Sequence, residues 1–289
     1  MKKNLLRSAL LVSLCAAGIS GFSSCGGNVV KGLDDGVLTI GLECDYAPFN
    51  WTTSVESEHT LPISNSAGNF ADGYDINFAK KLGEQLNVEV KIVKLEWSAL
   101  IVNLNSNVID CIIAGMTDTE ERRESIDFTN EYYRSELVFI TQKSLSDSYQ
   151  NQVLSSDQIN TVFGGKNLVS QVSTVTDDVL DIFATNYNSV HLTPVETFAR
   201  AANDVVTGAA FAMSAELPVA QAICSQNDGL GIVHVNQEVL GSYLSELGVS
   251  VGIRKGDNEL KDAINNVLAT YDTAARVNDM TSANERVSA

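Results

Sequence analysis

Short apolar runs alternate with amphipathic segments through the first half of the chain, a pattern typical of α/β proteins. We predict strands over residues 37–42, 88–93, 108–116 and 137–141. Between the first two strands, Asp75 is placed to cap a helix whose apolar residues recur on one face, and residues 97–104 predict a second, shorter helix. The continuous apolar character of 108–116 favours a buried parallel strand. A β-α-β-α-β order is therefore complete by residue 116.

A second unit of the same kind follows a polar, linker-like stretch over residues 142–160. Its predicted strands cover residues 168–172, 191–195, 209–213 and 230–235. A last strand over 243–254 and an amphipathic helix over 259–270 return to the first unit, and we expect the polar tail from Asp272 onward to fray. The chain thus divides into two α/β lobes, with lobe 2 inserted into lobe 1. The predicted ranges are 36–141 and 237–289 for lobe 1, and 142–236 for lobe 2.

The N-terminus has the pattern of an export signal. Basic residues at the start precede a short apolar run, Leu5 to Ile19, which is too short for a typical spanning helix. Cys25 follows small residues and glycines follow it, so residues 1–24 resemble a bacterial lipoprotein signal peptide with lipid attachment at Cys25. Phe22 departs from the leucine usual at that place, and plain secretion is the alternative. Residues 25–35 are then a tether, and the protein is expected outside the cytoplasm, anchored to the membrane by lipid.

Composition narrows the possible partners. The chain has 289 residues, 44% hydrophobic and 19% charged, with a net charge of -17. This is the composition of an ordinary globular protein, and the acidity argues against nucleic acid, whose phosphates need basic patches. Beyond the signal, Cys44, Cys111 and Cys224 have no metal-binding spacing. A disulfide between Cys44 and Cys111 and two buried free thiols are both compatible with the sequence.

The chain lacks catalytic motifs and instead carries recognition chemistry where strands end. We find no nucleophile elbow, phosphate loop or zinc helix, and the three histidines are isolated. Hydroxyl and guanidinium donors follow two of the predicted strands, at Thr117, Arg122, Ser173 and Thr174. Possible acceptors for an ammonium group are Glu43 and Glu216, with aromatic faces nearby. This set complements a zwitterion, although Arg122–Arg123 also fits a solvated surface pair and Ser173–Thr174 a plain helix cap.

The order and spacing of several motifs resemble the bacterial extracellular solute-binding proteins of family 3, the polar amino acid receptors of ABC importers. The motifs are Ile40-Gly41-Leu42-Glu43, Tyr46-Ala47-Pro48-Phe49, Gly73-Tyr74-Asp75-Ile76, Ile109-Asp110, Met116-Thr117, Thr119, Glu121-Arg122, Asp127-Phe128 and Tyr132-Tyr133. The likeness spans roughly residues 36–275 and is weaker in the second lobe. It implies an α/β, two-lobe periplasmic-binding-protein-like type II fold, whose lobes are joined by a two-strand hinge and close on the ligand.

The resemblance also implies roles for individual residues. Arg122 would hold the ligand carboxylate, helped by Thr117 and the backbone near Gly115. Ser173 and Thr174 would add donors, although the family usually has Gly-Thr there. Glu216 would accept from the α-amine, at a place where the family usually has Asp. Tyr46 and Trp97 would lie on either side of the ligand side chain. Glu43 would bind the polar end of that side chain.

The function implied is capture of a free amino acid, polar or basic, for an ABC permease in the inner membrane. No cofactor or metal is expected, and the protein is expected to be a monomer. The alternative is a periplasmic enzyme on the same fold, of the cyclohexadienyl dehydratase type. That enzyme needs a placed general acid or base, and no residue in the sequence stands out for the role.

Overall fold

The computed structural model describes Leu33 and residues 35–287. The predicted signal peptide, the predicted lipid attachment at Cys25 and most of the predicted tether lie outside these residues. In the part of the chain that is described, no helix combines the length and the apolar character needed to cross a membrane.

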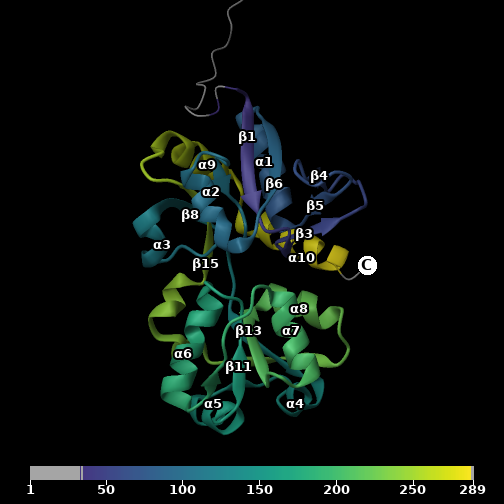
Figure 1. Cartoon of the computed structure of the whole chain (residues 1–289), viewed down its shortest axis with the longest axis vertical. Helices are drawn as coiled ribbons and strands as arrows, with labels where there is room; N and C mark the ends of the chain where they lie inside the picture. The colour runs from purple at the N-terminus through teal and green to yellow at the C-terminus, as the bar shows by residue number, and fades with distance from the viewer. Residues whose placement is uncertain (1–32, 34, 288–289) are drawn as a thin grey trace, which may run out of the picture.

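Two lobes lie one above the other (Figure 1). The first is built on a five-stranded sheet with the order β6-β1-β7-β15-β8. Its strands are β6 (Glu89–Lys94), β1 (Val37–Leu42), β7 (Cys111–Ile112), β15 (Gly248–Arg254) and β8 (Ile126–Arg134). β1 runs parallel to β6 and β7, whereas β15 is antiparallel to β7 and β8. The parallel strands therefore deliver the residues that follow β1 and β7 to the same edge of the sheet, facing the second lobe.

Helices and a small sheet complete the first lobe. The helices are α1 (Tyr74–Leu86), the 3-10 turn η1 (Trp97–Ala99), α2 (Leu100–Asn105), α3 (Glu120–Ser125), α9 (Asn258–Thr270) and α10 (Thr273–Val287). The residues from 45 to 72 form an antiparallel sheet with the order β2-β3-β5-β4. Its strands are β2 (Asp45–Tyr46), β3 (Asn50–Thr53), β5 (Phe70–Asp72) and β4 (Leu61–Pro62).

The second lobe contains a six-stranded sheet with the order β10-β14-β9-β13-β11-β12. The strands are β10 (Val153–Leu154), β14 (Leu230–Val235), β9 (Leu137–Gln142), β13 (Ala212–Glu216), β11 (Asn167–Val169) and β12 (Val190–His191). Its helices are α4 (Lys143–Ser148), α5 (Ser156–Phe163), α6 (Val175–Tyr187), α7 (Phe198–Thr207), α8 (Leu217–Ser225) and the 3-10 segment η2 (Gln237–Glu246). The predicted linker over 142–160 is therefore mostly structured, and a capping box at Ser155 starts α5.

Both lobe boundaries differ from those predicted at residues 141 and 236. β9 pairs antiparallel with β13 and β14, so the first crossing between lobes lies at 135–136. On the return, Leu240 and Leu247 are buried in the second lobe, and the second crossing comes immediately before β15. An apolar strand pattern shows that a segment is buried, but it does not show which sheet takes the strand.

Two predicted local features in the first lobe are also corrected. Only Cys111–Ile112 of the predicted strand over 108–116 pairs in the sheet, because the chain turns away toward the second lobe and Gly115 has a φ of 59°. The N-cap of α1 is Gly73 and not Asp75. Asp75 lies in the first turn of the helix, and its side chain is fully buried.

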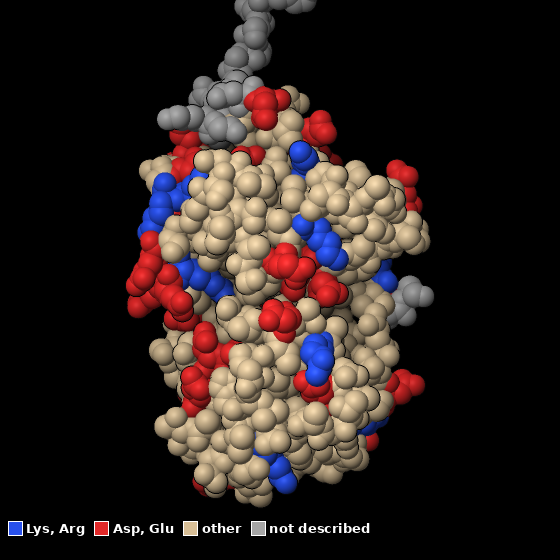
Figure 2. Space-filling model, viewed as in Figure 1, with Lys and Arg blue, Asp and Glu red and all other residues tan. Residues whose placement is uncertain are grey.

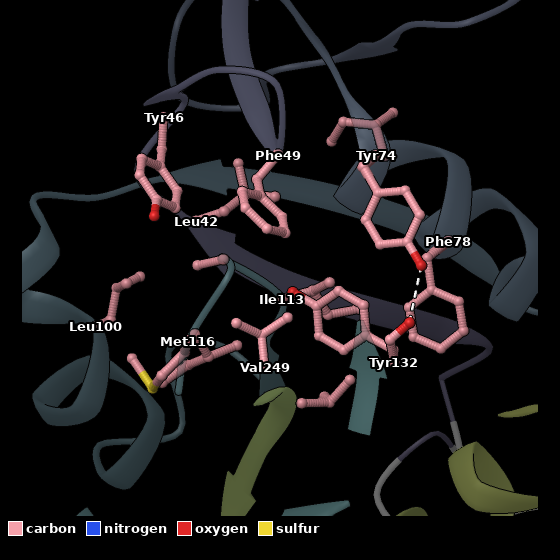
Figure 3. Packing of buried hydrophobic residues seen from close by; sticks show 14 of the residues in the cluster. Leu42, Tyr46, Phe49, Tyr74, Phe78, Leu100, Ile113, Met116, Tyr132 and Val249 are labelled. Atoms are coloured by element: carbon pink, nitrogen blue, oxygen red, sulfur yellow. Dashed lines mark hydrogen bonds between the residues drawn. The ribbon is translucent and has the colours of Figure 1, made fainter. Parts of the chain in front are cut away.

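The hydrophobic core is continuous between the lobes on one side. The larger cluster fills the first lobe and extends over one face of the second sheet, where Val138 and Ile140 of β9 reach it. The alternate residues Leu137 and Phe139 face a second cluster under α5 and α6. Figure 3 shows part of the first-lobe core, including stacked rings of Tyr132 and Phe78. The sequence allowed either a disulfide between Cys44 and Cys111 or two free thiols. In the structure both are buried free thiols.

Candidate functional site

A narrow cavity lies between the lobes. Both lobes line it, through the segments after β1 and β7 on one side and the ends of β11 and β13 on the other. The lining residues are Glu43, Tyr46, Trp97, Gly115, Thr117, Arg122, Gln171, Thr174, Val175, Phe198 and Glu216. Every residue predicted for the ligand site except Ser173 is in this set.

Glu43 is a buried carboxylate at the end of β1, only 5% exposed. Its Oε1 accepts a hydrogen bond of 3.0 Å from Nε2 of Gln171 in the second lobe. Burial raises the pKa of Glu43 to about 7, and nearby Asp45 and Glu96 add to the effect, whereas the Gln171 bond opposes it. Burial makes the ionised form of Glu43 unfavourable, so a cation that enters the cavity stabilises this form.

Gly115 brings the backbone close to the aromatic wall of the cavity. Its φ of 59° is in the left-handed region, and a Cβ there would lie 2.8 Å from the Tyr46 ring. Two residues later Thr117 forms a bridge to Val249, which ties this loop to the start of β15. The loop then enters α3, where the Thr119 hydroxyl caps the helix by accepting from the Arg122 amide at 3.2 Å.

Arg122 projects from the first turn of α3 toward the second lobe. Its NH1 donates to the Thr117 carbonyl at 2.6 Å and its NH2 to the Ser173 carbonyl at 2.9 Å. The guanidinium also lies over the Trp97 ring, 5.3 Å from the centroid. Among the described residues no carboxylate is within ion-pair distance of it, and burial lowers its pKa. A half-buried guanidinium that bonds only neutral carbonyls keeps further N–H donors for a carboxylate ligand.

Ser173 contributes its backbone rather than its side chain. The Ser173 carbonyl accepts from Arg122 and also from Trp97 Nε1 at 3.1 Å, so it joins the lobes. Its φ of 60° is in the left-handed region, which explains why glycine would suit the position. The following Thr174 caps α6 by accepting from the Asp177 amide at 3.2 Å. Thr174 is therefore both a helix cap and part of the cavity lining.

Glu216 lines the cavity from the second lobe, at the end of β13 and the start of α8. It accepts a hydrogen bond from the Tyr46 hydroxyl across the lobes. Burial raises the pKa of Glu216, while Tyr46 and the charge of Arg122 oppose the rise. The Tyr46 ring stacks on Phe49 and lies 4.9 Å from the Phe198 ring. Figure 3 shows the Tyr46 hydroxyl pointing away from the core rings of Tyr74 and Tyr132.

The sequence model of the family of bacterial extracellular solute-binding proteins, family 3, matches residues 38–281 of this chain. The chain is a member of this family. Its relatives include an L-arginine-binding protein of Pseudomonas aeruginosa, 28% identical over 239 residues that cover 80% of this chain and 81% of the relative. A histidine-binding periplasmic protein of Escherichia coli is 26% identical over 251 residues, covering 83% and 86%.

Solved structures support the same fold for this family 3 protein. One is an amino acid ABC transporter substrate-binding protein of Streptococcus pneumoniae bound to L-arginine, with a TM-score of 0.72 and 22% identity. The match covers 89% of this chain and 98% of the other. The predicted α/β fold of two type II lobes is confirmed. The family and its curated relatives are binding proteins and not enzymes, so the solute-binding assignment is confirmed.

Gln171 and Phe198 are parts of the site that the sequence did not identify. Gln171 follows β11, and its Nε2 bonds both Glu43 and the Glu196 carbonyl at 2.8 Å. Gln171 is a polar residue inside the predicted strand over 168–172, and that polar position was the available signal for it. Phe198 begins α7 with an ordinary apolar helical pattern, so its place opposite Tyr46 depends on how the two lobes of this family 3 protein meet.

Proposed function

We propose that this protein captures a free amino acid with a cationic side chain and delivers it to an ABC permease. The observation that carries the proposal is the charge set of the cavity. Among the described residues Arg122 has no carboxylate partner, and it shares the cavity with two carboxylates, the buried Glu43 and the half-buried Glu216. A ligand with one carboxylate, one ammonium and one side-chain cation neutralises all three, which is what buried charges require.

The proposed pose follows from these positions. The ligand carboxylate binds Arg122, with Thr117 and the backbone at Gly115 beside it, and the α-ammonium binds Glu216. The aliphatic part of the side chain lies between Tyr46 and Trp97. Its cationic end binds Glu43, while the acceptor oxygen of Gln171 is available as a second partner. Ser173 and Thr174 close the second-lobe side above the carboxylate.

The names of two relatives agree with a basic ligand, because one binds L-arginine and the other histidine. The lipoprotein-like segment before Cys25 supports delivery at the outer face of a membrane, by a monomer held through lipid. Radiolabelled palmitate incorporation that is lost in Cys25→Ala checks the anchor. Incorporation that is unchanged in this variant refutes the anchor without touching the ligand assignment.

Isothermal titration calorimetry with the purified protein tests the ligand class. We expect arginine to bind with a dissociation constant in the micromolar range or below, and lysine or histidine to bind more weakly. Glutamine, a neutral ligand of similar length, is the matched control and should bind least well. Tighter binding of glutamine than of every basic amino acid contradicts the cationic assignment.

A further inference from the structure

Asp75, near the start of α1, is a buried carboxylate outside the cavity lining. It is 0% exposed, and none of the described residues forms an ion pair with it. Its Oδ1 accepts from the Tyr132 hydroxyl at 2.7 Å and its Oδ2 from Asn50 Nδ2 at 2.8 Å. Burial raises its pKa to about 7, and these neutral donors offset part of that rise. A group this costly to bury suggests a role beyond packing.

Both hydrogen bonds continue to a backbone amide in a loop that reaches the cavity. The Tyr132 hydroxyl accepts from the Gly115 amide at 2.9 Å. The Asn50 side chain accepts, through Oδ1, from the Cys44 amide at 2.7 Å. One carboxylate is therefore connected, through one side chain each, to the residue after Glu43 and to the glycine two positions before Thr117.

Both amides belong to residues in the left-handed region of the backbone. Cys44 has a φ of 54° and Gly115 a φ of 59°. The left-handed conformation is strained for Cys44, which has a side chain, whereas glycine adopts it freely. The Thr52 hydroxyl also bonds the Cys44 carbonyl at 2.8 Å, so both sides of this residue are fixed. Fixed backbone at these two positions sets where Glu43 and the Gly115–Thr117 loop face the ligand.

We propose that Asp75 is a positioning residue that holds both first-lobe ligand loops through Asn50 and Tyr132. The inference rests on the proposed function, because the importance of these loops depends on their holding the ligand. Tyr132 is itself fixed, since its carbonyl accepts from the Tyr74 hydroxyl at 2.8 Å and its ring packs on Phe78 (Figure 3). The network thus connects a rigid part of the core to both sides of the cavity.

The test compares Asp75→Asn with a double variant that reverses the polarity of one bond. In Asp75→Asn one amide N–H faces a donor, so one branch is broken. In Asp75→Asn with Asn50→Asp, the new amide donates to the new carboxylate, whose other oxygen still accepts from Cys44. All hydrogen bonds of the network are then satisfied again. Asp72→Asn is the matched control, because Asp72 is a buried acid nearby that pairs with Arg286 instead.

Two quantities are measured, arginine affinity by calorimetry and amide hydrogen exchange at Cys44 and Gly115 by NMR. We expect Asp75→Asn to lower affinity by about 10–100-fold, the loss seen at metal sites when a partner that orients a ligand residue is removed. Exchange should accelerate at one or both amides, and the double variant should recover affinity and protection. Asp72→Asn should leave both quantities close to those of the native chain.

Unchanged affinity and unchanged protection in Asp75→Asn overturn the inference, even if the variant melts earlier. If Asp75→Asn does not fold, Tyr132→Phe takes its place and should expose the Gly115 amide while Cys44 stays protected. Equal protection of Gly115 in that variant also overturns the inference. If the native protein binds no basic amino acid, the proposed function fails, whereas the exchange data still decide whether Asp75 holds the loops.

Discussion

Arg122 and Arg123 are neighbours in sequence with opposite environments. The Arg123 side chain is 62% exposed and forms a bidentate ion pair with Asp118, through Nε at 2.6 Å and NH2 at 2.5 Å. Arg122 turns inward, bonds two carbonyls and lies over Trp97. The difference arises because α3 directs only one of two consecutive residues toward the second lobe. The pair therefore supplies a test residue and its own control.

We predict that Arg122→Ala lowers arginine affinity by about 2–5 kcal/mol, because the ligand carboxylate would be buried without a partner. Arg123→Ala should change affinity little, since that side chain meets solvent and a surface acid. Calorimetry on both variants, with circular dichroism to confirm folding, checks this. Equal arginine affinities in the two variants would refute the role of Arg122 in binding the ligand carboxylate.

Glu43 gives the affinity a predicted pH dependence. Its pKa is about 7 without a cation, and a bound guanidinium favours the ionised form, so ligand binding below pH 7 must expel a proton. Affinity for arginine should therefore rise with pH and fall by up to about tenfold per pH unit below 7. Titrations in two buffers of different ionisation enthalpy measure the released proton.

Glu43→Gln is the control for that pH dependence, because Asp75 also has a pKa of about 7. The amide does not titrate, so proton release should largely disappear and glutamine should gain relative to arginine. If Glu43→Gln keeps the full pH dependence, another group is responsible for it. The arginine ligand stays charged throughout this range and does not contribute.

Most of the site could be predicted because strand ends are visible in a sequence. Glu43, Thr117 and Glu216 each follow an apolar run, and parallel strands bring such ends to one edge. Gln171 and Phe198 were not identified, because the contacts that bring them to the site, with Glu43 and Tyr46, form between the lobes. Ser173 was placed at the site, but its carbonyl rather than its hydroxyl makes the contacts.

At the scale of elements, α10 shows how tertiary contacts override a weak pattern. Its polar sequence predicted a frayed tail, yet it forms a helix over Thr273–Val287 with Met280 and Ala283 buried. Arg276 donates to the carbonyls of Leu268, Tyr271 and Glu131, at 2.9, 2.7 and 2.9 Å. These acceptors lie on other elements, so the sequence of the tail alone does not reveal them.

We predict that Arg276→Ala lowers the free energy of unfolding by about 1.5–3 kcal/mol, because hydrogen bonds to a charged donor are lost at three carbonyls. Arginine affinity should stay close to that of the native protein, since Arg276 is away from the cavity lining. Arg200→Ala, which removes an exposed pair with Asp204, should cost about 0.5 kcal/mol or less. Urea unfolding followed by circular dichroism measures both, and equal effects would contradict the role given to Arg276.

At the scale of the whole molecule, the site exists only where both lobes contribute. Glu43 meets Gln171, Tyr46 meets Glu216, and the Ser173 carbonyl accepts from both Trp97 and Arg122. Two chain crossings connect the lobes, at 135–136 and just before β15. Movement of the lobes apart about these crossings would break all of these contacts together.

The acidic surface should also affect how fast a cationic ligand arrives. The net charge is -17, and Figure 2 shows acidic side chains along the middle of the visible face, where the lobes meet. Glu121, Asp178 and Glu246 surround Arg122 closely enough to raise its pKa against the effect of burial. Such a field attracts cations over about one Debye length and is screened by salt.

We predict that the association rate constant for arginine falls by about tenfold between 10 mM and 500 mM salt, while the dissociation rate changes little. Trp97 provides the signal, because its indole bonds Ser173 across the lobes, and Trp51→Phe removes the other tryptophan. Stopped-flow fluorescence on that variant gives both rates. Glutamine, which has no net charge, is the matched ligand and should associate at a rate nearly independent of salt. An arginine rate that is equally insensitive would exclude steering by the acidic surface, because that surface acts on the ligand only through its charge.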